Sequence, residues 1–251
     1  MRTAGVDLAS QAKLTGACTI AWAEGRAAVD ELWVGVDDER ITELAATVDK
    51  LGLDVPLGWP KAFVDAVAGH AADGTWPAGY FHADNQAFRY RRTDIWVRDQ
   101  PDGRRPLSVS SDRIALPAMR AAAVVARLHP RPPLDGSGRV VEAYPAASLH
   151  RWGLVHQGYK GAEGRHVRRR LVEELVDRTA GWLTVPPARV RHMVESDHAL
   201  DAVVAALTAR AAAVGLVEPI PPPDAGAARR EGWIALPTAG SLDRLARPAD
   251  G

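Results

Sequence analysis

The chain has 251 residues, 47% of them hydrophobic and 25% charged, so we expect a folded globular protein with a sizeable core. The 31 lysines and arginines balance 31 aspartates and glutamates, which argues against a protein that coats nucleic acid through a general basic excess. The single cysteine, Cys18, excludes an intramolecular disulfide and a cysteine-rich zinc site.

Hydrophobic periodicity predicts an alternation of strands and helices along most of the chain. In chain order, the predicted elements are strands at 4–9, 19–24 and 28–34, a helix over 37–51, a strand over 53–58, a helix from 60, a helix over 112–129, a strand over 139–144, helices over 163–180 and 197–215, and a strand over 231–236. This order predicts a single α/β domain over residues 1–251, with a mixed sheet flanked by helices.

Two segments depart from this alternation. Residues 73–108 mix glycine, aromatic residues, arginine and aspartate without a clear period, which indicates an insertion or a loop system near a site. Residues 238–251 show no clear pattern, and we expect them to form a loose tail.

Several carboxylates lie in segments whose other residues are expected to be buried. They are Asp7 in GVDLA, Asp54 in LDVPLG, Glu142 in VVEAYP and Asp201 in ALDAVVAA, with Asp197 one helical turn before Asp201. Burying a lone carboxylate costs several kcal/mol unless it is paired, hydrogen-bonded or metal-bound. We therefore expect a shared counter-charge, which is either arginine or a divalent cation.

The chemistry of these side chains favours a hard cation. Oxygen-only ligands favour Mg²⁺ or Mn²⁺, and no set of His and Cys at zinc spacing competes with them. Asp197 and Asp201 are four residues apart and share one helix face, which could meet the strand ends that carry Asp7 and Glu142. A two-metal hydrolase needs such a cluster, with ions about 3.5–4 Å apart.

Each of these acids also has a purely structural interpretation, and the sequence leaves both open. Asp197 is well placed to cap the helix that follows it, and Asp54 to cap a turn. His192 and His198 lie closest to the helix acids, and either could assist proton transfer, although a hydrogen-bonded structural histidine fits both positions better.

Basic residues are most concentrated at Arg89, Arg91 and Arg92, and Lys160 lies in a glycine-flanked loop. Guanidinium groups bind phosphate bidentately, so we expect these four side chains to bind a substrate backbone beside the metal. The alternative is a solvated loop with an internal Arg–Asp pair that involves Asp94.

Six segments together carry a family resemblance. In order they are GVDLA at 5–9, LDVPLGWP at 53–60, RYRRTD at 89–94, VEAYPAA at 141–147, HALDAVVAALTARA at 198–211 and EGWIALP at 231–237. They span nearly the whole chain, which resembles the domain of unknown function 429 family of predicted nucleases, in the RNase H-like, RuvC-like superfamily.

The resemblance implies an RNase H-like mixed sheet of five strands, and the predicted order of elements matches that fold. It also implies that Asp7, Glu142 and Asp201 are the catalytic residues, with Asp197 as a further helix acid and Asp54 as an additional acid. The implied activity is metal-dependent hydrolysis of phosphodiesters.

Three functions remain open from the sequence. The first is a nuclease that uses Mg²⁺ or Mn²⁺ on DNA or RNA. The second is a non-catalytic nucleic-acid-binding or scaffold protein that has kept the fold. The third, an actin-like phosphotransferase, fits less well because residues 9–16 contain one glycine where a phosphate-binding loop needs several.

The sequence also gives an expectation of location. No apolar run reaches the roughly 20 residues that a membrane-spanning helix needs, so we expect no membrane partner. The N-terminus opens into a strand-like run without a basic segment, an apolar stretch and a cleavage site, and we therefore expect a cytoplasmic protein.

Overall fold

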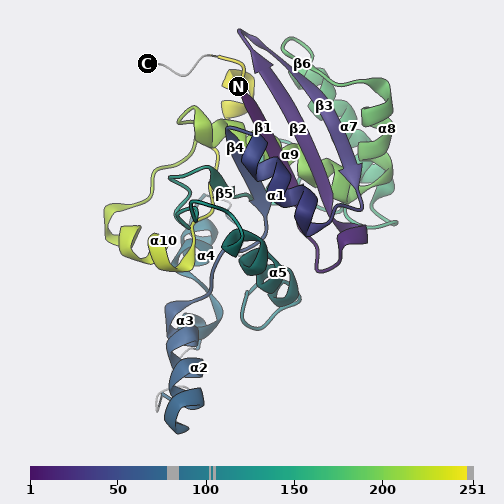
Figure 1. Ribbon diagram of the computed structural model, residues 1–251. Coiled ribbons are helices and arrows are strands. Elements are labelled where there is room, and N and C mark those ends of the chain that lie inside the picture. Colours follow the sequence, from purple (N-terminus) through teal and green to yellow (C-terminus); the bar gives the residue numbers. More distant parts are fainter. Residues whose placement is uncertain (78–84, 102, 104–105, 248–251) are drawn as a thin grey trace.

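A computed structural model describes residues 1–77, 85–101, 103 and 106–247 of the chain (Figure 1). One six-stranded sheet in these residues has the order β5-β4-β1-β2-β3-β6. Its strands are β1 (Arg2–Asp7), β2 (Gly16–Ala23), β3 (Arg26–Val34), β4 (Lys50–Asp54), β5 (Val140–Glu142) and β6 (Leu183–Thr184).

The sheet is mixed, as the sequence predicted. Strands β1, β4 and β5 run parallel to one another, and β2 is antiparallel to both β1 and β3. The predicted number of five strands was wrong, because the short β6 pairs in parallel with the far side of β3. A strand of two residues is too short to show a periodicity in the sequence.

Helices cover both faces of the sheet. The described α-helices are α1 (Asp38–Thr47), α2 (Lys61–Asp73), α3 (Gln86–Arg89), α4 (Arg92–Arg98), α5 (Ala115–Ala126), α6 (Pro145–Arg151), α7 (Arg165–Thr179), α8 (Pro187–Glu195), α9 (Asp197–Ala213) and α10 (Ala225–Glu231). One core lies between the sheet and α1 and α5, and the other lies between the sheet and α7, α8 and α9. Among the described residues, no helix has both the length and the apolar character that crossing a bilayer requires.

Several predicted segments turned out differently. The strand predicted over 53–58 lies earlier, at Lys50–Asp54, and the helix predicted over 37–51 ends at Thr47. Residues 231–236 do not form a strand, because α10 ends at Glu231 and Ile234 makes only an isolated bridge to Glu142. Helices α3 and α4 lie within the predicted insertion, of which 78–84, 102 and 104–105 are outside the described residues. The expected tail is packed as far as it is described, with Leu242 and Leu245 fully buried, and 248–251 are outside the described residues.

The alternation of side chains along the central strands decides which residues face α9. Leu51 and Leu53 of β4 belong to the core beneath α1 and α5. Successive strand residues point to opposite faces, so Gly52 and Asp54 face the other way, toward α9. The same alternation in β1 turns Gly5 and Asp7 toward this helix.

Glycine allows α9 to lie directly on the sheet. A Cβ atom on Gly5 would lie 2.1 Å from the carbonyl oxygen of Ala202, and one on Gly52 would lie 2.3 Å from that of Ala205. Any side chain larger than hydrogen would therefore push the helix away. This close contact holds the first turns of α9 against the carboxyl ends of β1 and β4.

Candidate functional site

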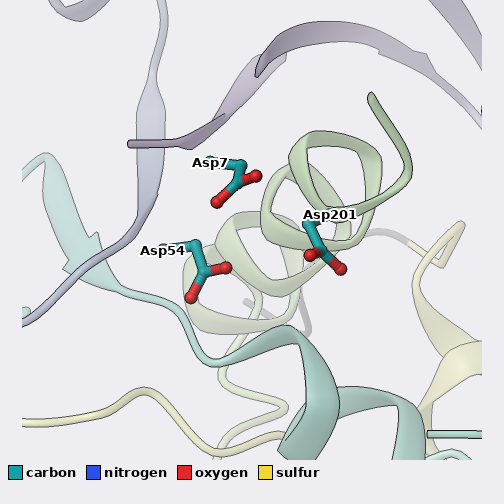
Figure 2. Close-up of side chains that lie close together, drawn as sticks. All are labelled: Asp7, Asp54 and Asp201. Carbon is teal, nitrogen blue, oxygen red and sulfur yellow. The ribbon is translucent and has the colours of Figure 1, made fainter. Parts of the chain in front are cut away.

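Three aspartates meet where β1, β4 and α9 converge (Figure 2). Asp7 and Asp54 are the last residues of the neighbouring parallel strands β1 and β4, and they are direct register partners. Asp201 projects from the second turn of α9. One carboxylate oxygen from each lies within 4.8 Å of the others. We call these three residues the aspartate trio.

Burial makes the negative charge of the trio costly. Asp201 is completely buried, and Asp7 is only 9% exposed. Burial, reinforced by the neighbouring Asp7, raises the pKa of Asp54 well above its usual value. Burial also raises the pKa of Asp201 to about 6, although Lys160 works in the opposite direction. The folded chain therefore tolerates this charge poorly without a cation.

The protein supplies only part of the counter-charge to the trio. Asp201 accepts a hydrogen bond of 2.8 Å from the Tyr159 hydroxyl and another from the Lys160 ammonium group. Asp7 contacts Nδ1 of His198 at 2.6 Å, and this hydrogen bond raises the pKa of His198. Within the described residues, neither oxygen of Asp54 has a hydrogen-bond partner.

Asp197 lies beside the trio but outside it. Its carboxylate accepts a hydrogen bond of 2.9 Å from the Gly161 backbone N–H. Although partial burial opposes this, that hydrogen bond and the nearby His198 lower the pKa of Asp197. Ser196, rather than Asp197, caps α9 by accepting a hydrogen bond from the Ala199 backbone. Asp197, predicted as a metal ligand, thus holds the loop that carries Lys160.

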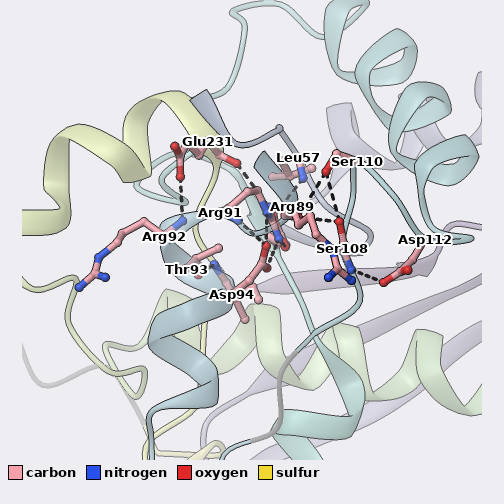
Figure 3. Close-up of polar contacts among 12 residues, drawn as sticks. Leu57, Arg89, Arg91, Arg92, Thr93, Asp94, Ser108, Ser110, Asp112 and Glu231 are labelled. Atoms are coloured by element: carbon pink, nitrogen blue, oxygen red, sulfur yellow. Dashed lines mark hydrogen bonds and ion pairs between the residues drawn. The ribbon is translucent and has the colours of Figure 1, made fainter. Parts of the chain in front are cut away.

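Glu142 is also outside the trio and has its own counter-charge. Its two oxygens accept hydrogen bonds of 2.6 Å each from the guanidinium group of Arg91, and the Leu57 N–H donates a third. Arg91 also binds Asp94, at 2.8 Å (Figure 3). We call Glu142, Arg91 and Asp94 the arginine-centred cluster. Burial raises the pKa of Glu142, although Arg91 opposes this shift.

The predicted phosphate-binding arginines do not gather at the trio. Arg91 is only 1% exposed, and its guanidinium group is occupied by Glu142 and Asp94. Arg92 pairs with Asp224 at 2.6 Å. Arg89 lies over the Tyr90 ring, 5.2 Å from its centroid, and is not among the residues that line the cleft described next. Of the four predicted basic residues, Lys160 is the one that touches the trio.

A cleft of about 450 Å³ opens over the two strand ends. Its floor includes Asp7, Asp54 and Glu142, and Lys160 also lines it. The segment before α5 and the first turn of this helix contribute Pro106, Leu107, Arg113, Ile114 and Pro117. A ligand in this cleft would meet carboxylates, apolar side chains and three cationic residues, Arg91, Arg113 and Lys160, of which Arg91 is already bound to Glu142 and Asp94.

Sequence reasoning missed two residues of this cleft. Arg113 is exposed and makes no hydrogen bond or ion pair within the described part of the chain, so its guanidinium group is free to bind a ligand. Tyr159 is buried against Asp201. No pattern in the sequence pointed to Arg113, whereas Tyr159 adjoins the glycine-flanked Lys160 that was predicted to reach the site.

One comparison with known proteins found a match. A family model described as Protein of unknown function (DUF429) matches residues 5–226, which include the trio and the arginine-centred cluster. No curated protein and no solved structure matches the chain.

Proposed function

The chain belongs to the DUF429 family, and from this premise we propose that it is a metal-dependent phosphodiester hydrolase acting on nucleic acid. The observation that carries the proposal is the convergence of Asp7, Asp54 and Asp201 on one point at the floor of a cleft. The sequence-based assignment of Glu142 as a catalytic acid is replaced in this proposal by Asp54.

We also infer that the fold is RNase H-like. The strand order β5-β4-β1-β2-β3, with β2 alone antiparallel among these five, supports this inference. The positions of Asp7 and Asp201 support it as well, because the family resemblance implies acids on the first strand and on a late helix, with Asp54 as an additional acid. On this interpretation, β6 is an addition at the edge of the sheet.

The residues of the trio fit a hard divalent cation. All three offer carboxylate oxygens, which Mg²⁺ and Mn²⁺ prefer. Asp54 is the strongest argument, because its raised pKa and its lack of a hydrogen-bond partner in the described residues mark a carboxylate whose charge the protein leaves unbalanced. Asp7, Asp54 and Asp201 would hold the ion, which would supply Lewis-acid activation of water and charge stabilisation at phosphorus.

The chain's own side chains would orient the substrate and the acids. Arg113 and Lys160, which both line the cleft, would bind phosphate oxygens. His198 fixes the orientation of Asp7 through its 2.6 Å contact. Tyr159 does the same for Asp201 by donating its hydroxyl hydrogen.

Cleavage of labelled single-stranded, duplex and branched DNA and RNA, with Mg²⁺ or Mn²⁺, tests the proposal. We expect the wild type to cleave at least one substrate and Asp54→Asn to lose at least about a hundredfold in rate, since even the loss of groups that support metal ligands costs ~10–100-fold. Asp65→Asn is the matched control, because Asp65 is an exposed carboxylate on α2 that pairs with Lys61. Equal rates for the wild type and Asp54→Asn would refute the proposal.

One observation favours a second candidate, a nucleic-acid-binding protein without catalysis. The ion pair of Lys160 with Asp201 already neutralises part of the trio, as expected of a site that has lost its metal. This candidate predicts that nucleic acid binds equally well with Mn²⁺ and with a chelator, and that no substrate is cleaved.

A further inference from the structure

Lys160 occupies an unusual place for a lysine at the rim of a cleft. Its ammonium group forms an ion pair with the fully buried Asp201 and lies 5.4 Å from the centroid of the Tyr159 ring. The Lys160 side chain nevertheless remains 54% exposed. The Lys160 side chain is thus largely exposed to solvent, yet its ammonium group pairs with a buried carboxylate.

The loop around Lys160 is built to hold this position. The buried guanidinium group of Arg168 donates hydrogen bonds to the backbone carbonyls of Tyr159 and Gly161, the two neighbours of Lys160, at 2.5 and 2.9 Å. Arg168 also binds the Val194 carbonyl at 3.0 Å, which ties the loop to the end of α8. Asp197 holds Gly161 from the other side.

The acceptor positions of the trio are unevenly occupied. Both oxygens of Asp201 accept hydrogen bonds, Oδ1 from Tyr159 and Oδ2 from Lys160. One oxygen of Asp7 is taken by His198. Within the described residues, this leaves the other oxygen of Asp7 and both oxygens of Asp54 without a partner. The vacant acceptors therefore belong to Asp7 and Asp54 rather than to Asp201, which Lys160 occupies.

The charges of the trio favour a single divalent cation. The three carboxylates of the trio carry three negative charges when ionised, and Lys160 balances one of them. A single divalent cation balances the remaining two charges of the trio. The contact of His198 with Asp7 reduces the need for a second cation further.

We propose that Lys160 takes the place of a second metal ion, so that the trio binds one divalent cation, between Asp7 and Asp54. This inference rests on the proposed function, because it assumes that the trio binds metal. It departs from the two-ion arrangement that the sequence suggested.

Calorimetric titration with Mn²⁺ of the wild type, Lys160→Gln and Lys160→Arg tests the proposal without relying on activity. We expect one Mn²⁺ per chain for the wild type and for Lys160→Arg, which keeps the charge. For Lys160→Gln we expect either a second Mn²⁺ or an affinity at least about tenfold higher, because the competing cation is gone. Lys61→Gln is the matched control, since Lys61 is an exposed lysine on α2.

The outcomes separate the two proposals. Two Mn²⁺ per wild-type chain, or a Lys160→Gln variant with unchanged stoichiometry and affinity, would overturn the role of Lys160 and leave the proposed hydrolase intact. No Mn²⁺ binding by any folded variant would overturn both. Circular dichroism shows whether Lys160→Gln is folded. If this variant is unfolded, the stoichiometries of the wild type and Lys160→Arg still test the proposal. Two Mn²⁺ per chain in either protein would overturn it.

Discussion

Two groups of carboxylates border the same cleft and are neutralised in different ways. In the arginine-centred cluster, Glu142 and Asp94 share the guanidinium group of Arg91, and all three side chains are at most 3% exposed. In the aspartate trio, the ammonium group of Lys160 reaches one member, Asp201, and Asp54 has no partner in the described residues.

This difference in counter-charge shows that burial alone does not identify a functional acid. Glu142 and Asp54 both occupy apolar strands and both have a raised pKa caused by burial. What separates them is the counter-charge, which is built into the fold for Glu142 and incomplete for Asp54. A carboxylate that the protein leaves unbalanced is the better candidate for binding a cation from solution.

The largest expected effect concerns Arg91. In Arg91→Met, Glu142 and Asp94 remain buried without a counter-charge, and we expect the free energy of unfolding to fall by about 3–5 kcal/mol. Arg92→Met is the control, because Arg92 is half exposed and its pair with Asp224 should contribute only about 0–1 kcal/mol. Urea denaturation measures both; equal losses for the two variants would contradict the structural role of the arginine-centred cluster.

The next effect is a pH dependence that arises from the trio. The pKa of Asp201 in the folded chain is about 6, above the 3.8 of an ordinary aspartate, so the folded state binds this proton more tightly than the unfolded state. The stability that this proton provides is complete below pH ~4 and is lost as the pH rises to about 6, by about 3 kcal/mol.

Asp201→Asn isolates this contribution. We expect the difference in unfolding free energy between the wild type and Asp201→Asn, measured with a chelator, to shift against the wild type as the pH rises through this window. A difference that stays constant, or that shifts in favour of the wild type, would show that the charge of the trio is already compensated in the metal-free protein.

The smallest expected effect is that of Arg113→Ala on substrate binding. Arg113 lines the cleft without a partner in the described residues, so its loss should raise KM by about tenfold, or about 1.4 kcal/mol, with little change in kcat or stability. Arg89→Ala is the control, since Arg89 is not among the residues that line the cleft. An unchanged KM for Arg113→Ala would remove Arg113 from the proposed site.

The sheet and most of the long helices were predictable, because their patterns are local. An acid within an apolar strand predicted both Asp7 and Asp54, and strand alternation explains why they face the same helix. The strand β6 was not predictable, since two residues carry no period.

The counter-charges were not predictable either, because they come from distant segments. Arg91 lies 51 residues from Glu142 in the chain, and Lys160 lies 41 residues from Asp201. Arg91 was predicted to bind phosphate because a segment rich in arginine has the same sequence pattern whether its side chains bind a ligand or pair with a buried carboxylate. Likewise, Gly5, Gly52 and the helix over 197–215 are visible in the sequence, but the close packing of this helix on the two glycines is not.

The most direct test of the account is the location of Mn²⁺ by anomalous diffraction from crystals of the protein grown with this ion. The account predicts an anomalous peak bound by Asp7 and Asp54 and none at Glu142, whose oxygens are occupied by Arg91. A peak at Glu142, or no peak at the aspartate trio in crystals saturated with Mn²⁺, would contradict it.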